Sequence, residues 1–162
     1  MCLRERITSE SSSIPLQTDG ERSEGASYLE IAEWIQRHCM NVDENLIELF
    51  RRIVFNIAVS NCDDHLRNHG FIYYPKGWTL SPAYDLTPDP AGYGLKLNIS
   101  ETDNSLDYDL ALSITPYLGI KKDRAVAIVE QIKSVVAEWR KVAKRYGISK
   151  SEHDLVEIAF RC

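Results

Sequence analysis

Residues 61–70 read Asn-Cys-Asp-Asp-His-Leu-Arg-Asn-His-Gly, and this decapeptide concentrates the chemically useful side chains of the chain. Carboxylates, imidazoles and carboxamides stand here between a long apolar stretch and a short one. Within it, Asp63 and Asn68 are five positions apart. Seventeen residues after Asn68, Asp85 lies in the sequence Pro-Ala-Tyr-Asp-Leu of residues 82–86. The pattern predicts a polar loop on a rigid element, with a second acidic loop that returns to it.

The spacing of these polar residues is that of a phosphoryl-transfer site. Protein kinases place an Asp, four residues and then an Asn in their catalytic loop, and a metal-binding Asp follows later in the chain. An acceptor hydroxyl needs a carboxylate that orients it and takes its proton. The magnesium ion of the nucleotide needs hard oxygen ligands, such as an amide carbonyl and a second carboxylate.

The local sequence also resembles a known family. The stretches Asn61 to Phe71 and Trp78 to Pro88 are closely similar to the HipA-like serine/threonine kinases of bacterial toxin–antitoxin modules. The similarity is strongest over residues 50–90 and extends more weakly from about Gln17 to the C-terminus. The family's N-terminal half, with its phosphate-covering loop and ATP-anchoring lysine, has no counterpart in this chain.

The resemblance implies a role for each matching residue. Asp63 would be the catalytic base, and Asn68 and Asp85 would hold Mg²⁺ beside ATP, the phosphoryl donor. His65 occupies the position of a kinase-loop histidine, where it would shape the catalytic loop by hydrogen bonding. Tyr84 would line the nucleotide pocket, although an aromatic residue beside a hairpin can equally belong to the core. The implied partners are a HipB-like antitoxin, a complementing N-terminal kinase lobe and a protein substrate.

Two alternatives to an active kinase lobe remain open at this point. The chain could be a truncated or split lobe whose function is non-catalytic protein interaction. The cluster Asp63, Asp64, His65 and His69 could instead bind a metal in a hydrolase, since His65 and His69 have i, i+4 spacing. We expect Asp64 to be a solvated or turn-bonding carboxylate that points away from Asp63.

Composition limits the other classes of function. The chain has 162 residues, of which 44% are hydrophobic and 27% are charged, as in one ordinary globular domain. It has no apolar run near ~18 residues and no signal-peptide core. A net charge of −5 without a basic stripe argues against nucleic acid as a direct ligand. The four cysteines have no paired spacing, which favours free thiols in the cytoplasm.

The expected fold is mainly α (α+β): a kinase-like helical C-terminal lobe whose β-hairpin carries the catalytic and metal-binding loops. Residues 1–26 are expected to be loop or extended chain, and residues 27–162 to form the lobe. A helix should begin at Ser27, since Ser27 and Glu30 have capping-box spacing. The other expected elements are a core helix over 43–59, hairpin strands over 71–74 and 77–80, a short strand over 95–99, and helices within 107–118, 123–146 and 151–160.

Overall fold

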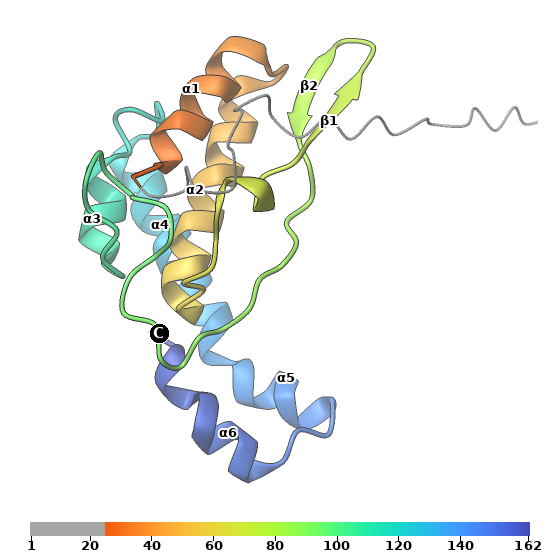
Figure 1. Ribbon diagram of the computed structural model, residues 1–162, viewed down its shortest axis with the longest axis vertical. Helices are drawn as coiled ribbons and strands as arrows, with labels where there is room; N and C mark the ends of the chain where they lie inside the picture. Colours follow the sequence, from red (N-terminus) through yellow and green to blue (C-terminus); the bar gives the residue numbers. More distant parts are fainter. Residues whose placement is uncertain (1–24) are drawn as a thin grey trace, which may run out of the picture.

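The computed structural model describes residues 25–162. The expectation for residues 1–26 therefore lies almost wholly outside the described residues. The fold is built around α2, which spans Val42–Val59 and runs through the middle of the molecule in Figure 1. Apolar side chains recur along it at helical spacing, and Phe50 and Ile53 are completely buried. The predicted core helix is confirmed.

Helix α1 spans Tyr28–His38 and packs against α2. The backbone N–H of Ser27 donates to Glu30 Oε1 at 3.0 Å, as the capping-box spacing predicts. The inward face of α1 consists of fully buried residues that join the core formed with α2: Tyr28, Ile31 and Ile35. The N-terminus of α1 thus has a defined position on the central helix.

The hairpin has the predicted strands, β1 over Phe71–Tyr74 and β2 over Gly77–Leu80, paired antiparallel. Two interactions fix it to the helices. The N–H of Met40 donates to the carbonyl of Trp78 at 2.9 Å, and the N–H of Leu80 donates to Asn45 Oδ1 at 2.6 Å. The hairpin is therefore anchored at the start of α2, although the loop before β1 leaves the far end of that helix (Figure 1).

The strand expected over 95–99 does not form. Leu95, Leu97 and Ile99 are buried, which explains the apolar signal, but among residues 25–162 their segment has no neighbouring strand with which to build a ladder. Within this described part it forms only isolated bridges, between Asn98 and Ser27 and between Gly94 and Ser105. The segment is core-packed irregular chain that leads to the short helix α3, Tyr108–Ser113.

The long helix expected over 123–146 is two helices, α4 over Lys122–Ala137 and α5 over Trp139–Arg145. They meet at Glu138. Trp139 stacks on Phe160, with ring centroids 4.1 Å apart and planes inclined by only 5°. The bend thus accompanies a long-range aromatic contact that the helical pattern alone does not reveal.

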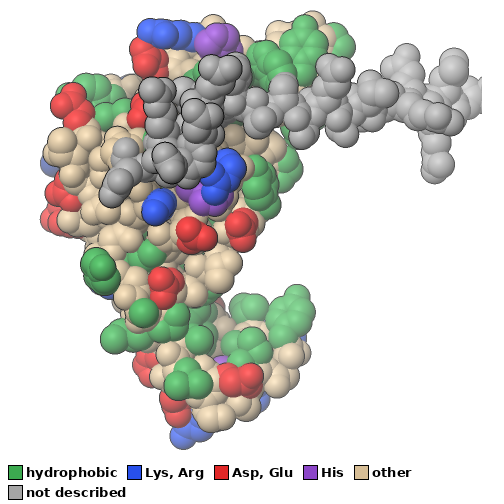
Figure 2. All heavy atoms as spheres, in the orientation of Figure 1, with side chains coloured by type: hydrophobic (Ala, Val, Ile, Leu, Met, Phe, Trp, Pro, Cys, Tyr) green, Lys and Arg blue, Asp and Glu red, His purple; other side chains and the backbone are tan. Residues whose placement is uncertain are grey.

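The chain ends with α6, Lys150–Val156, and the 3₁₀ turn η2, Glu157–Ala159. Helices α5 and α6 project from the body as an arm (Figure 1). Figure 2 shows a hollow between the body and this arm. Phe160 fixes the end of the arm to a small cluster of Ala58, Val59 and Val136. None of the helices in residues 25–162 is long and apolar enough to cross a membrane.

We predict that Ile53→Ala lowers the free energy of unfolding by about 2–5 kcal/mol, because it opens a cavity in the most buried part of α2. Urea denaturation measures the change. Ile158→Ala is the matched control, since its side chain is 70% exposed. The control should change stability by less than ~0.5 kcal/mol. Equal losses in the two variants would contradict the central place of α2.

Candidate active site

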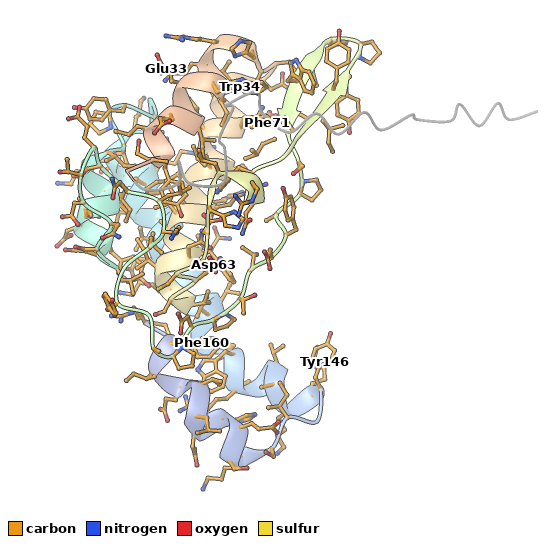
Figure 3. All side chains as sticks on the ribbon, viewed as in Figure 1. Glu33, Trp34, Asp63, Phe71, Tyr146 and Phe160 are labelled. Atoms are coloured by element: carbon orange, nitrogen blue, oxygen red, sulfur yellow. The ribbon has the colours of Figure 1, made fainter. Side chains whose placement is uncertain are left out.

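The C-terminal end of α2 sets the position of the polar loop. Ser60 ends the helix in the left-handed conformation, with φ of 50°, and the N–H of Asn61 donates to the carbonyl of Asn56 at 2.9 Å. The chain then passes through the 3₁₀ turn η1, Leu66–Asn68, before it enters β1. Asp63 lies exposed on this loop, in front of α2 in Figure 3. A rigid helix therefore presents the predicted base to solvent.

The hairpin returns the chain to the same place. Immediately after β2, the N–H of Ser81 donates to the carbonyl of Gly70 at 2.8 Å. Four residues later, the Oδ2 atom of Asp85 lies 3.5 Å from Nδ2 of Asn68. Asp85 itself has φ of 57°, a conformation that Asp tolerates better than most residues. The structure thus brings together the two residues predicted to hold the metal.

The donor set of this pair fits magnesium. Asn68 is buried and Asp85 is exposed, so a carboxylate at the surface lies next to a buried carboxamide. Rotation of the amide by half a turn exchanges its nitrogen and oxygen, an assignment that hydrogen-bond geometry alone decides. The amide oxygen would then lie close to the Asp85 carboxylate, and both are hard ligands of the kind that Mg²⁺ prefers.

Tyr84 links the two loops. Its hydroxyl donates to the carbonyl of Arg67 at 2.6 Å, and burial raises the pKa of Tyr84. A Cβ atom at position 70 would lie 3.1 Å from Ser81 Oγ and 3.3 Å from the Tyr84 hydroxyl, so Gly70 permits this close approach. Tyr84 is therefore tied to the loop that carries Asn68, and its contact with a nucleotide stays a prediction.

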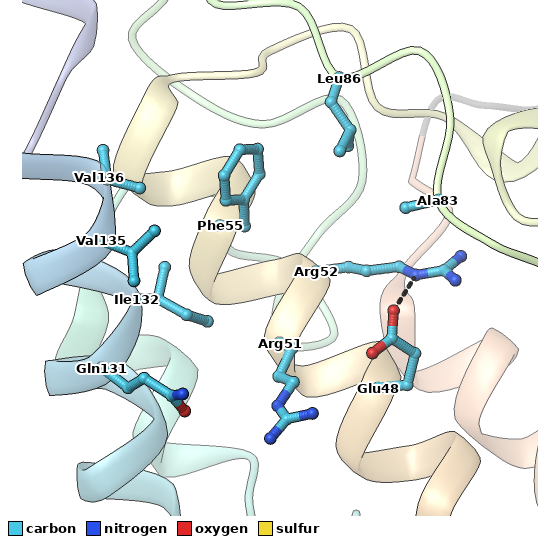
Figure 4. A pocket seen from close by; sticks show the side chains of 10 residues that line it. All are labelled: Glu48, Arg51, Arg52, Phe55, Ala83, Leu86, Gln131, Ile132, Val135 and Val136. Atoms are coloured by element: carbon cyan, nitrogen blue, oxygen red, sulfur yellow. Dashed lines mark hydrogen bonds and ion pairs between the residues drawn. The ribbon is translucent and has the colours of Figure 1, made fainter. Parts of the chain in front are cut away.

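Sequence reasoning missed Arg52, a buried arginine on α2. Its Nε donates to Glu48 Oε1 at 3.2 Å, and its guanidinium also donates to the carbonyl of Ser81, where the Asp85 segment begins. The i, i+4 spacing of Glu48 and Arg52 could have indicated their ion pair. Nothing in the sequence indicated the bond from Arg52 to Ser81. Nearby, Ala83 and Leu86 cover a pocket of about 360 Å³ between α2 and α4 (Figure 4).

Asp64 is not the solvated carboxylate that we expected. It is 2% exposed, and its Oδ2 atom accepts three hydrogen bonds. Tyr28 donates its hydroxyl at 2.6 Å, Asn56 donates from Nδ2 at 2.7 Å, and His69 Nε2 lies at 3.0 Å. Burying a carboxylate is tolerated only where such donors replace water. The expectation was wrong because these donors come from two helices and from the far side of η1.

Of the two remaining loop residues, Asn61 has a supporting hydrogen bond, whereas the bond expected to let His65 shape the loop is not seen at its Nδ1 atom among the residues that the structure describes. His65 is half-buried at the start of η1 and its Nδ1 finds no partner among residues 25–162, while Asn61 Nδ2 donates to Asn56 Oδ1 at 3.0 Å. Within the described part of the chain, no group of three His, Cys, Asp or Glu side chains is arranged to hold a metal. The hydrolase alternative of Asp63, Asp64, His65 and His69 lacks its ligand cluster, since His69 and Asp64 are paired in the interior.

Charged side chains gather around this loop. Figure 2 shows acidic, basic and histidine side chains together in the middle of the visible face, where the loop after α2 lies in Figure 1. The loop and its surroundings therefore carry charges of both signs at the surface (Figure 2).

Comparison with known proteins assigns the family. The sequence model of the HipA-like C-terminal domain matches residues 3–139, so this chain belongs to that family. A Haemophilus influenzae protein described as "Putative kinase" is 43% identical over 63 residues, which cover 36% of this chain and 18% of that protein.

A solved structure shares the fold. HipA of Shewanella oneidensis MR-1, in a complex with HipB and operator DNA, matches with a TM-score of 0.67 and 19% identity. The match covers 84% of this chain and 34% of that HipA chain. The mainly helical fold of residues 25–162, with its β-hairpin, is therefore that of the HipA C-terminal domain. The chain spans about a fifth to a third of the length of these two proteins.

We predict that Tyr28→Phe weakens the loss of stability at alkaline pH. Burial, followed by the charge of Asp64, raises the pKa of Tyr28 well above its usual value. A raised pKa in the folded state gives stability that is complete below the unfolded pKa, near 10, and is lost as the pH rises beyond it. Urea denaturation from pH 8 to pH 11 should show a shallower decline for the variant.

The Tyr28→Phe variant should also be less stable than the wild type at pH 8, since it removes a donor from a buried carboxylate. Tyr93→Phe is the control, since its side chain is 93% exposed, and this variant should match the wild type throughout. Identical alkaline profiles for the wild type and Tyr28→Phe would show that Tyr28 does not ionise against Asp64.

Proposed function

We propose that this domain is the catalytic lobe of a HipA-like serine/threonine protein kinase, which transfers the γ-phosphoryl group of ATP to a protein hydroxyl with Mg²⁺. One observation supports the proposal above all. The chain brings the Asn68 carboxamide and the Asp85 carboxylate to 3.5 Å, beside a loop that presents Asp63 to solvent. Carboxylate, amide and carboxylate in this order are the parts that phosphoryl transfer requires on this side of a nucleotide.

Each residue has a separate task in this proposal. Asp63 accepts a hydrogen bond from the acceptor hydroxyl and takes its proton as the oxygen attacks the γ-phosphorus and the bond to the leaving ADP breaks. Asn68 and Asp85 would supply oxygens to a magnesium ion, and the ion would neutralise charge on the phosphates. Tyr84 ties the Asp85 segment to the loop through the carbonyl of Arg67, and Arg52 ties it to α2 through the carbonyl of Ser81.

The proposed partners follow from the family. The solved HipA structure that shares this fold is a complex with HipB and operator DNA, which supports a HipB-like protein as a partner of this domain. Phosphoryl transfer also needs groups that cover the nucleotide from the opposite side. We therefore propose that an N-terminal kinase lobe completes the site. We also propose that the domain works in the cytoplasm, where cysteines without paired spacing remain free thiols.

The isolated chain should bind Mg²⁺–ATP weakly, because the nucleotide touches only one wall of its site. Isothermal titration calorimetry measures this affinity. We expect a dissociation constant well above the micromolar range. A value of a few micromolar, about −8 kcal/mol, would show that this lobe alone suffices for nucleotide binding.

Catalysis is tested in the enzyme assembled with its N-terminal lobe. Asp63→Ala should lower turnover by ~10²–10⁴ and leave nucleotide binding largely intact, since it removes the base only. Asp85→Ala should damage both turnover and nucleotide binding, because it removes a metal ligand. Asp154→Ala, on the exposed surface of α6, is the control and should behave as the wild type.

Two results would argue against this assignment. Wild-type turnover in Asp63→Ala would remove the base role from Asp63. An assembled protein with no phosphoryl transfer, but with a stable complex between the lobe and a protein partner, would instead favour a non-catalytic interaction module.

A further inference from the structure

We propose that Asp64 is the positioning residue of the loop: it fixes the backbone that carries Asp63 and Asn68 and takes no part in proton transfer. This inference rests on the proposed function for its consequence, but its physical basis is independent of catalysis. The two adjacent aspartates then have opposite tasks. Asp63 is exposed to solvent, where it can meet the acceptor hydroxyl, and Asp64 is buried in the interior, where it fixes the backbone.

The first argument is the convergence of three chain segments on one oxygen. The Oδ2 atom of Asp64 accepts from Tyr28 on α1, from Asn56 on α2 and from His69 just after η1. Tyr28 and Asn56 are also joined to each other at 3.2 Å. A single carboxylate oxygen therefore ties the loop to both helices of the core.

The second argument is where the anchors lie along the loop. Asn61, Asp64 and His69 all belong to one hydrogen-bonded group, since Asn61 Nδ2 donates to Asn56 Oδ1. Asp63 lies between the first two anchors, and Asn68 comes directly before the third. Every predicted functional side chain of the loop is thus next to a buried anchor. Loss of the central anchor, Asp64, would therefore release both Asp63 and Asn68.

The third argument separates Asp64 from the base role. A general base must reach the proton that it accepts, within hydrogen-bond distance or through one water. Asp64 is 2% exposed, and its Oδ2 atom already has three donors, whereas Asp63 is exposed.

These arguments predict different results for two variants. Asparagine keeps the shape of the side chain and one acceptor oxygen, so Asp64→Asn can still receive the donors of Tyr28, Asn56 and His69. Asp64→Ala removes the shared acceptor of all three donors in the interior and leaves Asn56 Nδ2 with the Tyr28 hydroxyl alone. If Asp64 positions the loop, Asp64→Asn should largely restore what Asp64→Ala destroys. If Asp64 were the base, both variants would be equally inactive.

The test is amide hydrogen exchange of the full chain followed by NMR. The reporters are the N–H groups of Asn68 and His69, which donate to His65 and Leu66 within the loop at 2.9 and 3.2 Å. In Asp64→Ala, their exchange should rise at least about tenfold more than that of the α2 core amides, or ~1.4 kcal/mol of local opening. In Asp64→Asn and in the control Asp63→Ala, the rise should stay below ~threefold.

Binding of Mn²⁺ gives the functional readout, followed by paramagnetic broadening of the Asn68 and Asp85 resonances. Asp64→Ala should weaken Mn²⁺ binding at least about tenfold, and Asp64→Asn should recover most of the affinity. If the wild type binds no Mn²⁺ at this pair, the proposed function fails, while the exchange measurement still decides whether Asp64 fixes the loop.

Three outcomes would overturn the inference. Exchange at Asn68 and His69 could stay at the wild-type level in Asp64→Ala, exchange could rise equally in α2 and in the loop, or Asp64→Asn could match Asp64→Ala. If Asp64→Ala does not fold, Tyr28→Phe replaces it, because this variant removes one of the three donors. It should then give a smaller rise that is still confined to the loop, and a rise spread equally over α2 would count against the inference.

Discussion

A buried carboxylate with three donors on one oxygen holds this domain's loop in place. Removing the charge of Asp64 from water is unfavourable, and the bonds from Tyr28, Asn56 and His69 offset that loss only if α1, α2 and the loop are all in register. The interaction therefore couples the packing of the two helices to the geometry of the candidate site. Apolar burial on α2 gives the domain its core, but hydrophobic contacts are not directional and do not fix how one element is oriented against another. The hydrogen bonds to Asp64 fix the orientation of α1, α2 and the loop.

The return of the chain depends on a second set of polar contacts. The hairpin is anchored at the start of α2, and Arg52, Gly70 and Tyr84 then hold the segment that leads to Asp85. Two loops from different parts of the sequence meet because each is fixed separately to α2. This explains how a carboxamide and a carboxylate seventeen positions apart come to lie 3.5 Å from each other.

Local patterns in the sequence predicted most of the fold. The strands 71–74 and 77–80 have the predicted bounds, and α2 begins one residue before the predicted start, because both depend on turn residues and short-range periodicity. Contacts between distant residues were not predictable in this way. Asp64 gave no sign of burial because Tyr28 is thirty-six positions away, and the bend at Glu138 accompanies the stacking of Trp139 on Phe160. Spacing in the sequence predicted the candidate site residues, whereas the contacts that support them required the structure.

Family membership and site geometry support different conclusions. The family match and the TM-score of 0.67 establish a HipA-like C-terminal domain. At 19% identity, the structural match supports the fold only and not the function. The proposed chemistry rests on the geometry of Asp63, Asn68 and Asp85. Anomalous diffraction from crystals of the chain soaked in Mn²⁺ tests it most directly. We predict one peak bound by the Asn68 amide oxygen and the Asp85 carboxylate, at about 2.1–2.2 Å from each. A metal bound elsewhere, with this pair free, would contradict the account.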